Sequence, residues 1–175
     1  DVVRILLTKK EIQINQKRYN QESADVVRLL LARTEIQINK ESANGATPLF
    51  IACREDNVDI VHLLLARKEI QINQAANGGA TPLAVACEKG HVKVINALLA
   101  RKEIHINQAR KDGVTPLLLA CQKGHVKVVN ALLARIEIHI NQPTNDGVTP
   151  LYVACSYGHV DVVRLLLARK EIQIN

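Results

Sequence analysis

One pattern recurs along this chain at a fixed step of 34 residues, and it constrains the possible fold more than any other feature. A repeat of about 20–50 residues is the signature of a solenoid, in which each unit buries its apolar side only against its neighbours. Most recurring residues are therefore expected to be structural, and function is expected among the positions that differ between units. The recurring tripeptide Thr-Pro-Leu begins at Thr47, Thr81, Thr115 and Thr149, and the recurring asparagines are Asn39, Asn73, Asn107, Asn141 and Asn175.

The repeated unit predicts a short helix, a tight turn, a longer helix and a hairpin-like loop. In one copy, Thr81 is suited to an N-cap and Pro82 to the first helical position. Gly90 is suited to a left-handed cap at the end of that helix. The next apolar residues follow the i, i+3, i+4, i+7 spacing of a buried helical stripe. Isoleucines then alternate with polar residues as in an extended segment, and Asp112-Gly113 predicts a turn before the next unit.

The run Gly-Val-Thr-Pro-Leu, followed by Ala, Gly-His-Val, Val-Val and Leu-Leu across 113–133 and its copies, resembles the ankyrin repeat. The resemblance covers essentially the whole chain and implies an all-α solenoid of helix-turn-helix units with hairpin-like loops between repeats. The step of 34 exceeds the usual step of about 33, with the extra residue in 101–104. We therefore expect the second helix to run about one residue longer or its exit loop to bulge. The usual histidine after Thr-Pro-Leu is replaced, which puts the family's polar network there in doubt; the replacements are Phe50, Ala84, Leu118 and Tyr152.

The array is expected to be a single domain with one irregular unit near its start. Between Asn15 and Asn39 the step is 24 residues, ten short of 34, and the shortfall lies at Asn20–Gln21. Either this unit is degenerate, or the numbering crosses a gap, and the register kept on both sides favours the gap. A Cα–Cα distance near 3.8 Å at that bond would exclude it. The units are a partial repeat 1–15, a shortened or incomplete repeat 16–46, repeats 47–80, 81–114 and 115–148, and a terminal partial repeat 149–175.

The composition indicates a protein that does not enter membranes. No apolar run approaches the roughly 18–20 residues of a membrane span, and no signal-peptide pattern opens the chain. The four cysteines recur once per unit, and equivalent positions in stacked helices lie about 8–10 Å apart. That spacing exceeds the limit of about 7 Å between Cα atoms for a disulfide. Free, buried thiols are therefore expected, which predicts an intracellular, cytoplasmic or nuclear location; they are Cys53, Cys87, Cys121 and Cys155.

The net charge of +6 is largely balanced locally, because five arginines each stand two residues before a glutamate. The remainder predicts at most a mild preference for acidic partners. Nucleic-acid binding would require a basic face with interleaved aromatic residues or a reading helix. The middle units concentrate basic residues but almost lack aromatic ones, so no nucleic acid is expected. The basic residues are Lys89, Lys93, Arg110, Lys111, Lys123 and Lys127.

No pattern typical of catalysis or of cofactor binding occurs. The chain lacks His-Glu-x-x-His and Cys-x-x-Cys spacings, a Gly-x-Ser-x-Gly elbow and a phosphate-binding loop. The histidines at the start of the second helices are better explained by a hydrogen bond within the turn than by metal binding. We therefore expect no enzyme activity, no metal and no cofactor. These histidines are His91, His125 and His159.

The resemblance implies a protein–protein interaction module that grips its partner on a concave face made of hairpin tips and the exposed side of each first helix. Arginine and tyrosine are over-represented among interface anchors, so Arg54, Arg110, Tyr152 and Tyr157 are the first candidates. The alternative is a structural or self-associating spacer, because the array shows no polar capping unit and its open ends would stack on copies of itself. The candidate partner-binding residues are Phe50, Arg54, Glu55, Ala76, Asn77, Glu88, Lys89, Arg110, Lys111, Gln122, Lys123, Thr144, Asn145, Tyr152, Ser156 and Tyr157.

Overall fold

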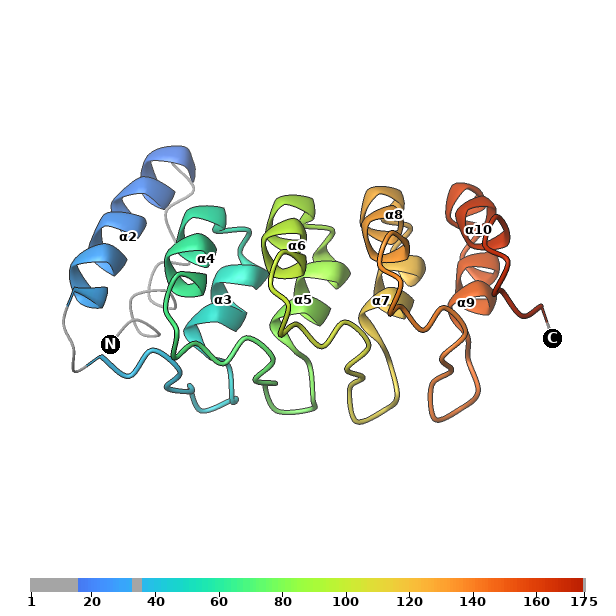
Figure 1. Ribbon diagram of the computed structural model, residues 1–175, viewed down its shortest axis with the longest axis horizontal. Helices are drawn as coiled ribbons and strands as arrows, with labels where there is room; N and C mark the ends of the chain where they lie inside the picture. Colours follow the sequence, from blue (N-terminus) through green and yellow to red (C-terminus); the bar gives the residue numbers. More distant parts are fainter. Residues whose placement is uncertain (1–15, 33–35, 175) are drawn as a thin grey trace.

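The computed structural model describes residues 16–32 and 36–174, and within these ranges it contains helices and no strands. The partial unit 1–15 lies outside the described residues. The helices are α2 (Gln16–Leu31), α3 (Pro48–Arg54), α4 (Val58–Leu65), α5 (Pro82–Lys89), α6 (Val92–Leu99), α7 (Pro116–Gln122), α8 (Val126–Leu133), α9 (Pro150–Ser156) and α10 (Val160–Leu167). Figure 1 shows α2 at one end of a row of four helix pairs, α3–α4, α5–α6, α7–α8 and α9–α10, with the hairpin-like loops all on the same side of the row.

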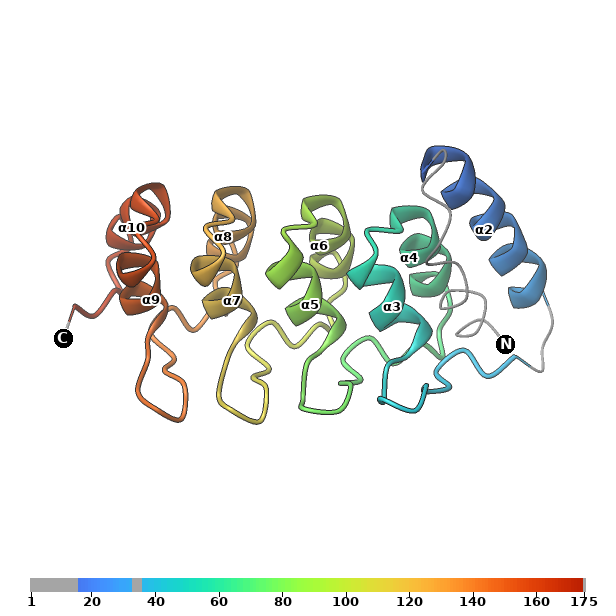
Figure 2. The ribbon, with the colours of Figure 1, turned by 180° about the vertical axis from the view of Figure 1, so that it is seen from behind.

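The helices form two layers, and the core lies between them. The first helices α3, α5, α7 and α9 pack side by side, and the second helices α2, α4, α6, α8 and α10 do the same (Figure 1 and Figure 2). Each first helix also packs on the second helix of its own unit. The leucines that face this core, Leu64, Leu98, Leu132 and Leu166, are 0% exposed. The prediction of an all-α helix-turn-helix solenoid is confirmed.

Each first helix begins as predicted from its Thr-Pro-Leu signature. The Thr81 hydroxyl accepts a hydrogen bond from the backbone N–H of Ala84 at 3.1 Å, and Pro82 opens the helix. Gly90 follows the helix in the left-handed conformation, with φ +79°. The first unit has Asp56 at the equivalent position, also with positive φ. A short polar side chain tolerates this conformation better than most.

The second helix of the unit is followed by an exit loop made of turns. Helix α6 ends at Leu99, and its cap Ala100 keeps right-handed helical geometry. The chain then leaves through two successive turns, closed by Arg101 N–H to Leu98 C=O and Ile104 N–H to Arg101 C=O. Whether the extra residue of the unit lengthens the helix or its exit loop stays a prediction. Ile104 and Ile106 beyond the helix are buried, but their segment contains turns and no strand.

The irregular unit near the start takes a form that the alignment of repeats did not predict. Residues 16–20 match a loop in later units, yet they form the beginning of α2, a helix of 16 residues. This helix spans Asn20–Gln21. The two interpretations of the irregular unit, a degenerate repeat and a gap in the numbering, both stay predictions. Helix α2 packs on α4, in the layer of the second helices.

Candidate functional site

Three of the recurring arginines, each at the exit of a second helix, bond to the preceding unit. Arg67 donates from Nη1 to the Leu31 carbonyl at 2.6 Å, Arg135 donates to the Leu99 carbonyl at 2.9 Å, and Arg101 makes the equivalent bond to Leu65. The last carbonyls of a helix have no partner within the helix, so each arginine caps the neighbouring second helix.

The same arginines also pair with glutamate, as the sequence predicted. Arg135 lies 2.8 Å from Glu137, and Arg67 lies 2.6 Å from Glu69. The hydrogen bond from Arg135 holds the pKa of the Glu137 carboxyl below its usual value. These charges are therefore engaged within the framework, and they are not free for a partner.

The recurring asparagine clamps the next unit through both atoms of its amide. Asn107 donates from Nδ2 to the Glu137 carbonyl at 2.7 Å, and its Oδ1 accepts from the His139 N–H at 2.9 Å. The sequence showed the recurrence of this residue but not its bonds, which reach 30 and 32 residues ahead. We call this arrangement the asparagine clamp. The clamps join Asn39 to Glu69 and Gln71, Asn73 to Glu103 and His105, Asn107 to Glu137 and His139, and Asn141 to Glu171 and Gln173.

The recurring histidines are also part of the framework. The Nε2 atoms of His91, His125 and His159 lie 3.1, 3.0 and 2.9 Å from backbone carbonyls of the preceding unit. The predicted bond within the turn is therefore wrong in its partner, because each imidazole links two units. In the described part of the chain, no three His, Cys, Asp or Glu side chains gather as a metal site would require.

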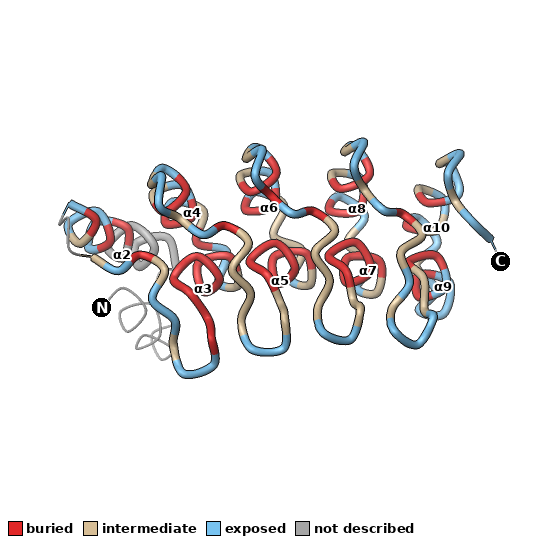
Figure 3. Tube along the Cα trace, turned by 60° about the horizontal axis from the view of Figure 1, so that its bottom comes forward, coloured by how far each residue is buried: buried red, intermediate tan, exposed pale blue. Residues whose placement is uncertain are grey.

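The hairpin tips form a row joined by hydrogen bonds, because the backbone of each tip bonds to that of the tip before it. Asn77 N–H donates to the Asn44 carbonyl, Lys111 N–H to Gly78 and Asn145 N–H to Asp112, each at 3.1 Å. Figure 3 shows this row of loops as an exposed edge beside the buried first helices. The tip side chains therefore stand on a backbone that the neighbouring units hold in place.

Not every predicted tip residue is available to a partner. Thr144 accepts from the Val148 N–H at 3.1 Å, and Asn145 donates from its side chain to the Lys111 carbonyl at 3.0 Å. Arg110 pairs with Asp112 at 3.0 Å and is half-buried, as is Ala76. Exposed side chains at the tips include those of Asn77 and Lys111.

The position after Thr-Pro-Leu does not face a partner, which corrects the prediction for Phe50. Phe50 is only 8% exposed, and its equivalents Ala84 and Leu118 are 1% and 3% exposed. Tyr152 occupies the same position and is 63% exposed. The difference arises because α5 covers Phe50, whereas no described unit packs beyond α9. Tyr152 therefore differs from its equivalents in its described neighbours and not in its position within the unit.

The remaining predicted residues gather where each first helix ends. Glu55, Lys89, Lys123, Ser156 and Tyr157 are exposed. Three further predicted residues are half-buried, and their carbonyls accept the histidine bonds; they are Arg54, Glu88 and Gln122.

Two of these side chains are held in place by neighbours. The Tyr157 ring stacks on His159, with ring centroids 6.2 Å apart and an interplanar angle of 11°. Its hydroxyl lies 3.4 Å from Gln122 Nε2. Arg54 pairs with Glu55 at 2.7 Å.

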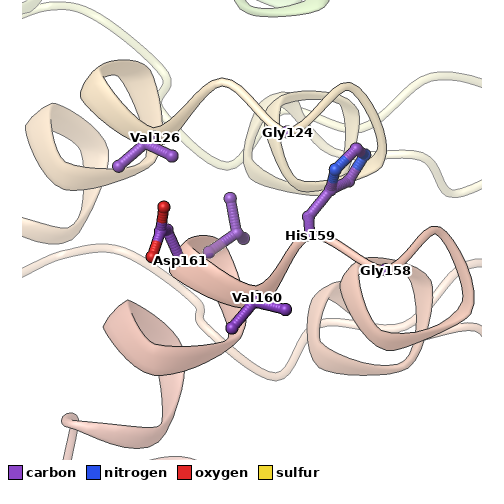
Figure 4. A pocket seen from close by; sticks show the side chains of 7 residues that line it. Gly124, Val126, Gly158, His159, Val160 and Asp161 are labelled. Carbon is purple, nitrogen blue, oxygen red and sulfur yellow. The ribbon is translucent and has the colours of Figure 1, made fainter.

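Shallow grooves separate the helix-turn-helix turns of neighbouring units. Figure 4 shows one of about 320 Å³, in which Val126 and Gly124 of one unit face His159 and Asp161 of the next. The imidazole there already bonds to a backbone carbonyl, and one carboxylate is the only other ionisable group lining this groove. The groove therefore offers a surface for contact and no set of groups that would activate a substrate.

One exposed residue escaped the sequence-based prediction. Ile136 is 98% exposed in the loop after α8. The equivalent positions hold Lys68, Lys102 and Lys170. The replacement of lysine by isoleucine at a repeated surface position was the available signal.

Comparison with models of protein families finds ankyrin repeats, in three copies, over residues 18–110 and 101–175. A search of curated proteins finds no match to the chain. Proteins built from these repeats generally act as protein–protein interaction modules and are generally non-enzymatic scaffolds. No helix in the described ranges is long and apolar enough to cross a membrane.

Proposed function

This chain belongs to the ankyrin repeat family, and on that premise we propose that it is a non-catalytic module that binds another protein. The partner is held on the concave face formed by the hairpin tips and the ends of the first helices. One observation carries this proposal. The residues that recur bond to neighbouring units, whereas residues that differ between units are exposed along this face, among them Asn77, Lys111 and Tyr157.

The rigidity of the face supports the same proposal. Backbone bonds join successive tips, and Tyr157 is stacked on His159. Binding is costly when loops and side chains must be ordered at the interface. A face that is ordered in advance avoids much of this cost, so a few anchors such as Tyr157 and Lys111 suffice for useful affinity.

The experiment compares two triple variants of the full chain in affinity for a partner captured from a lysate. Arg110→Ala/Lys111→Ala/Tyr157→Ala removes three side chains of the proposed face. Asn96→Ala/Asn130→Ala/Arg164→Ala is the matched control, because these exposed residues occupy one repeated position on the second helices.

We expect the first variant to lose about 30-fold or more in affinity, in line with interface anchors. The control should change affinity by less than about threefold. Equal affinity of both variants, or a larger loss in the control, would contradict the proposal.

A further inference from the structure

The structure divides the basic residues of the middle units into two groups. Arg110 and Lys111 lie at a hairpin tip, and Arg110 is paired there with Asp112. The four lysines at the opposite end of the units surround the turns between first and second helices. We call these the lysine patch: Lys89, Lys93, Lys123 and Lys127, all exposed.

The lysine patch is not neutralised by its own chain. Within the described residues, none of the four lysines lies within 4 Å of a carboxylate oxygen, whereas several arginines are paired in this way, among them Arg54 and Arg164. Lys93 borders a groove that also contains Asp56 and Asp59. The ammonium groups of Lys89, Lys123 and Lys127 are therefore the main free positive charges at this end.

The patch is confined to the two middle units by acidic residues at equivalent positions. Asp59 and Asp161 replace Lys93 and Lys127 in the units on either side. Glu55 stands one unit before Lys89, at the same place in the first helix. A polyanion that continued past two units would meet these carboxylates, so the charge pattern selects a short acidic ligand.

The row that ends the first helices has a spacing that suits an extended peptide. Lys89, Lys123 and Tyr157 occupy equivalent positions at the ends of helices α5, α7 and α9, which pack side by side. Packed helices lie about 8–10 Å apart, and an extended chain in the polyproline II conformation advances about 3.1 Å per residue with three residues per turn. Side chains three residues apart in such a peptide lie on one side of it, about 9 Å apart, and therefore meet successive positions of the row.

Tyr157 supplies an apolar position at the end of this row. The ring is 60% exposed. Its stacking on His159 leaves it ordered before a partner arrives, and tyrosine is among the residues enriched at binding hot spots.

We propose that this row binds an extended, acidic protein segment with two carboxylates three residues apart and an aromatic side chain three residues further on. The carboxylates pair with Lys89 and Lys123, supported by Lys93 and Lys127, and the aromatic side chain packs on Tyr157. This inference deepens the proposed function and rests on it.

The test measures the binding of two synthetic peptides of equal composition to the full chain. NMR titration gives the affinity of each peptide. Glu-Ser-Ser-Glu-Ser-Ser-Phe has the required spacing, and Glu-Glu-Ser-Ser-Ser-Ser-Phe does not. We expect the spaced peptide to bind about tenfold more tightly, with an affinity that falls as salt rises from about 50 to 500 mM. Equal affinity for both peptides, or no binding of either at millimolar concentration, would overturn the inference.

Variants assign the binding to the row. Lys89→Gln/Lys123→Gln should lower the affinity for the spaced peptide about tenfold. Lys102→Gln/Lys170→Gln, which changes two exposed lysines of the exit loops, should have no effect. Tyr157→Ala should lower the affinity for this peptide but not the affinity for an analogue that has Ser in place of Phe. Circular dichroism checks that each variant is folded, and equal losses in both lysine pairs would refute the assignment.

An oligothymidine of about the same length provides the competing class of ligand. Tighter binding of this oligonucleotide, lost in Lys89→Gln/Lys123→Gln, would overturn the inference in favour of nucleic acid. The outcome is separable from that of the proposed function. Suppose that binding of a captured protein requires Arg110, Lys111 and Tyr157 but the spaced peptide does not bind. The proposed function then stands and this inference fails.

Discussion

At the scale of single residues, this protein is held together by polar side chains that bond to the backbone of a neighbouring unit. The asparagine clamp satisfies one carbonyl and one N–H at once, and the arginine beside it caps a helix in the unit before. Such bonds contribute individually little, about 0.5–1.5 kcal/mol each. Their repetition at every junction makes them a substantial part of the attraction between units.

Asn107→Ala removes both bonds of one clamp. We expect it to lower the free energy of unfolding by about 1–3 kcal/mol, because two bonds of ordinary strength are lost. Urea denaturation monitored by circular dichroism measures the change. Asn130→Ala is the control, since Asn130 is exposed in the middle of α8 and alanine favours helix. A smaller effect at Asn107 than at Asn130 would show that the clamp does not stabilise the stack.

The four cysteines are predicted to differ in reactivity although their surroundings in the sequence are alike. Cys155 is exposed, while Cys53, Cys87 and Cys121 are buried, and all four are free. Burial raises the pKa of the Cys121 thiol to about 12, and it also raises the pKa values of Cys53 and Cys87.

With a maleimide at pH near 7, Cys155 should therefore be labelled first in the folded protein. The three buried thiols should react only after unfolding. Mass spectrometry of proteolytic fragments identifies the labelled site, and early labelling of Cys121 would contradict the described packing.

At the scale of elements, the hairpin loops determine how closely the units approach one another. A Cβ atom built on Gly113 would lie 2.6 Å from the backbone nitrogen of Asn145, whereas one built on Gly147 would meet nothing within 4 Å. Both glycines have positive φ, at 82° and 81°. They therefore share the same backbone requirement and differ only in the presence of a following described hairpin.

Comparison of Gly113→Ala with Gly147→Ala separates these two effects. Each substitution places an alanine in the left-handed backbone conformation, which lowers the free energy of unfolding by about 1–2 kcal/mol. Gly113→Ala should cost at least about 1 kcal/mol more, because it must also push the next hairpin away. Thermal unfolding measures both, and equal losses would mean that contact between the hairpins is unimportant.

At the scale of the whole molecule, the stack behaves as a line of units that each contact only their neighbours. The stability of such an array is approximately a sum of unit and junction contributions. Helix α6 packs between α4 and α8, whereas α10 has one described neighbour in its layer. Identical changes in the middle and at the end should therefore have different consequences.

Leu98→Ala and Leu166→Ala test this difference, since both side chains are 0% exposed. Leu98→Ala should destabilise the whole array by about 2–5 kcal/mol. Leu166→Ala should instead loosen the last unit, seen as faster amide exchange in α9 and α10 with little change in α4 and α6. Uniform loss of protection in both variants would indicate that the array unfolds as one cooperative body.

Much of the fold was predictable from local sequence, and less of the candidate face was. The threonine caps, Gly90 and the buried helical stripes depend on residues a few positions apart. Phe50 and Tyr152 occupy the same position and follow the same tripeptide, but only the structure shows that α5 covers one of them. The beginning of α2 was missed because the alignment of repeats transferred a loop to residues that form a helix.

The sequence by itself determined the repeat, the register of its helices and the positions that vary, because these follow from spacing along the chain. Only the tertiary structure decided which polar residues join units, since their partners lie 30–37 residues away. It also decided which of several equivalent residues face solvent, as with buried Cys121 and exposed Cys155. The physical reason is that burial in a solenoid depends on the neighbouring unit, and a local pattern does not specify that neighbour.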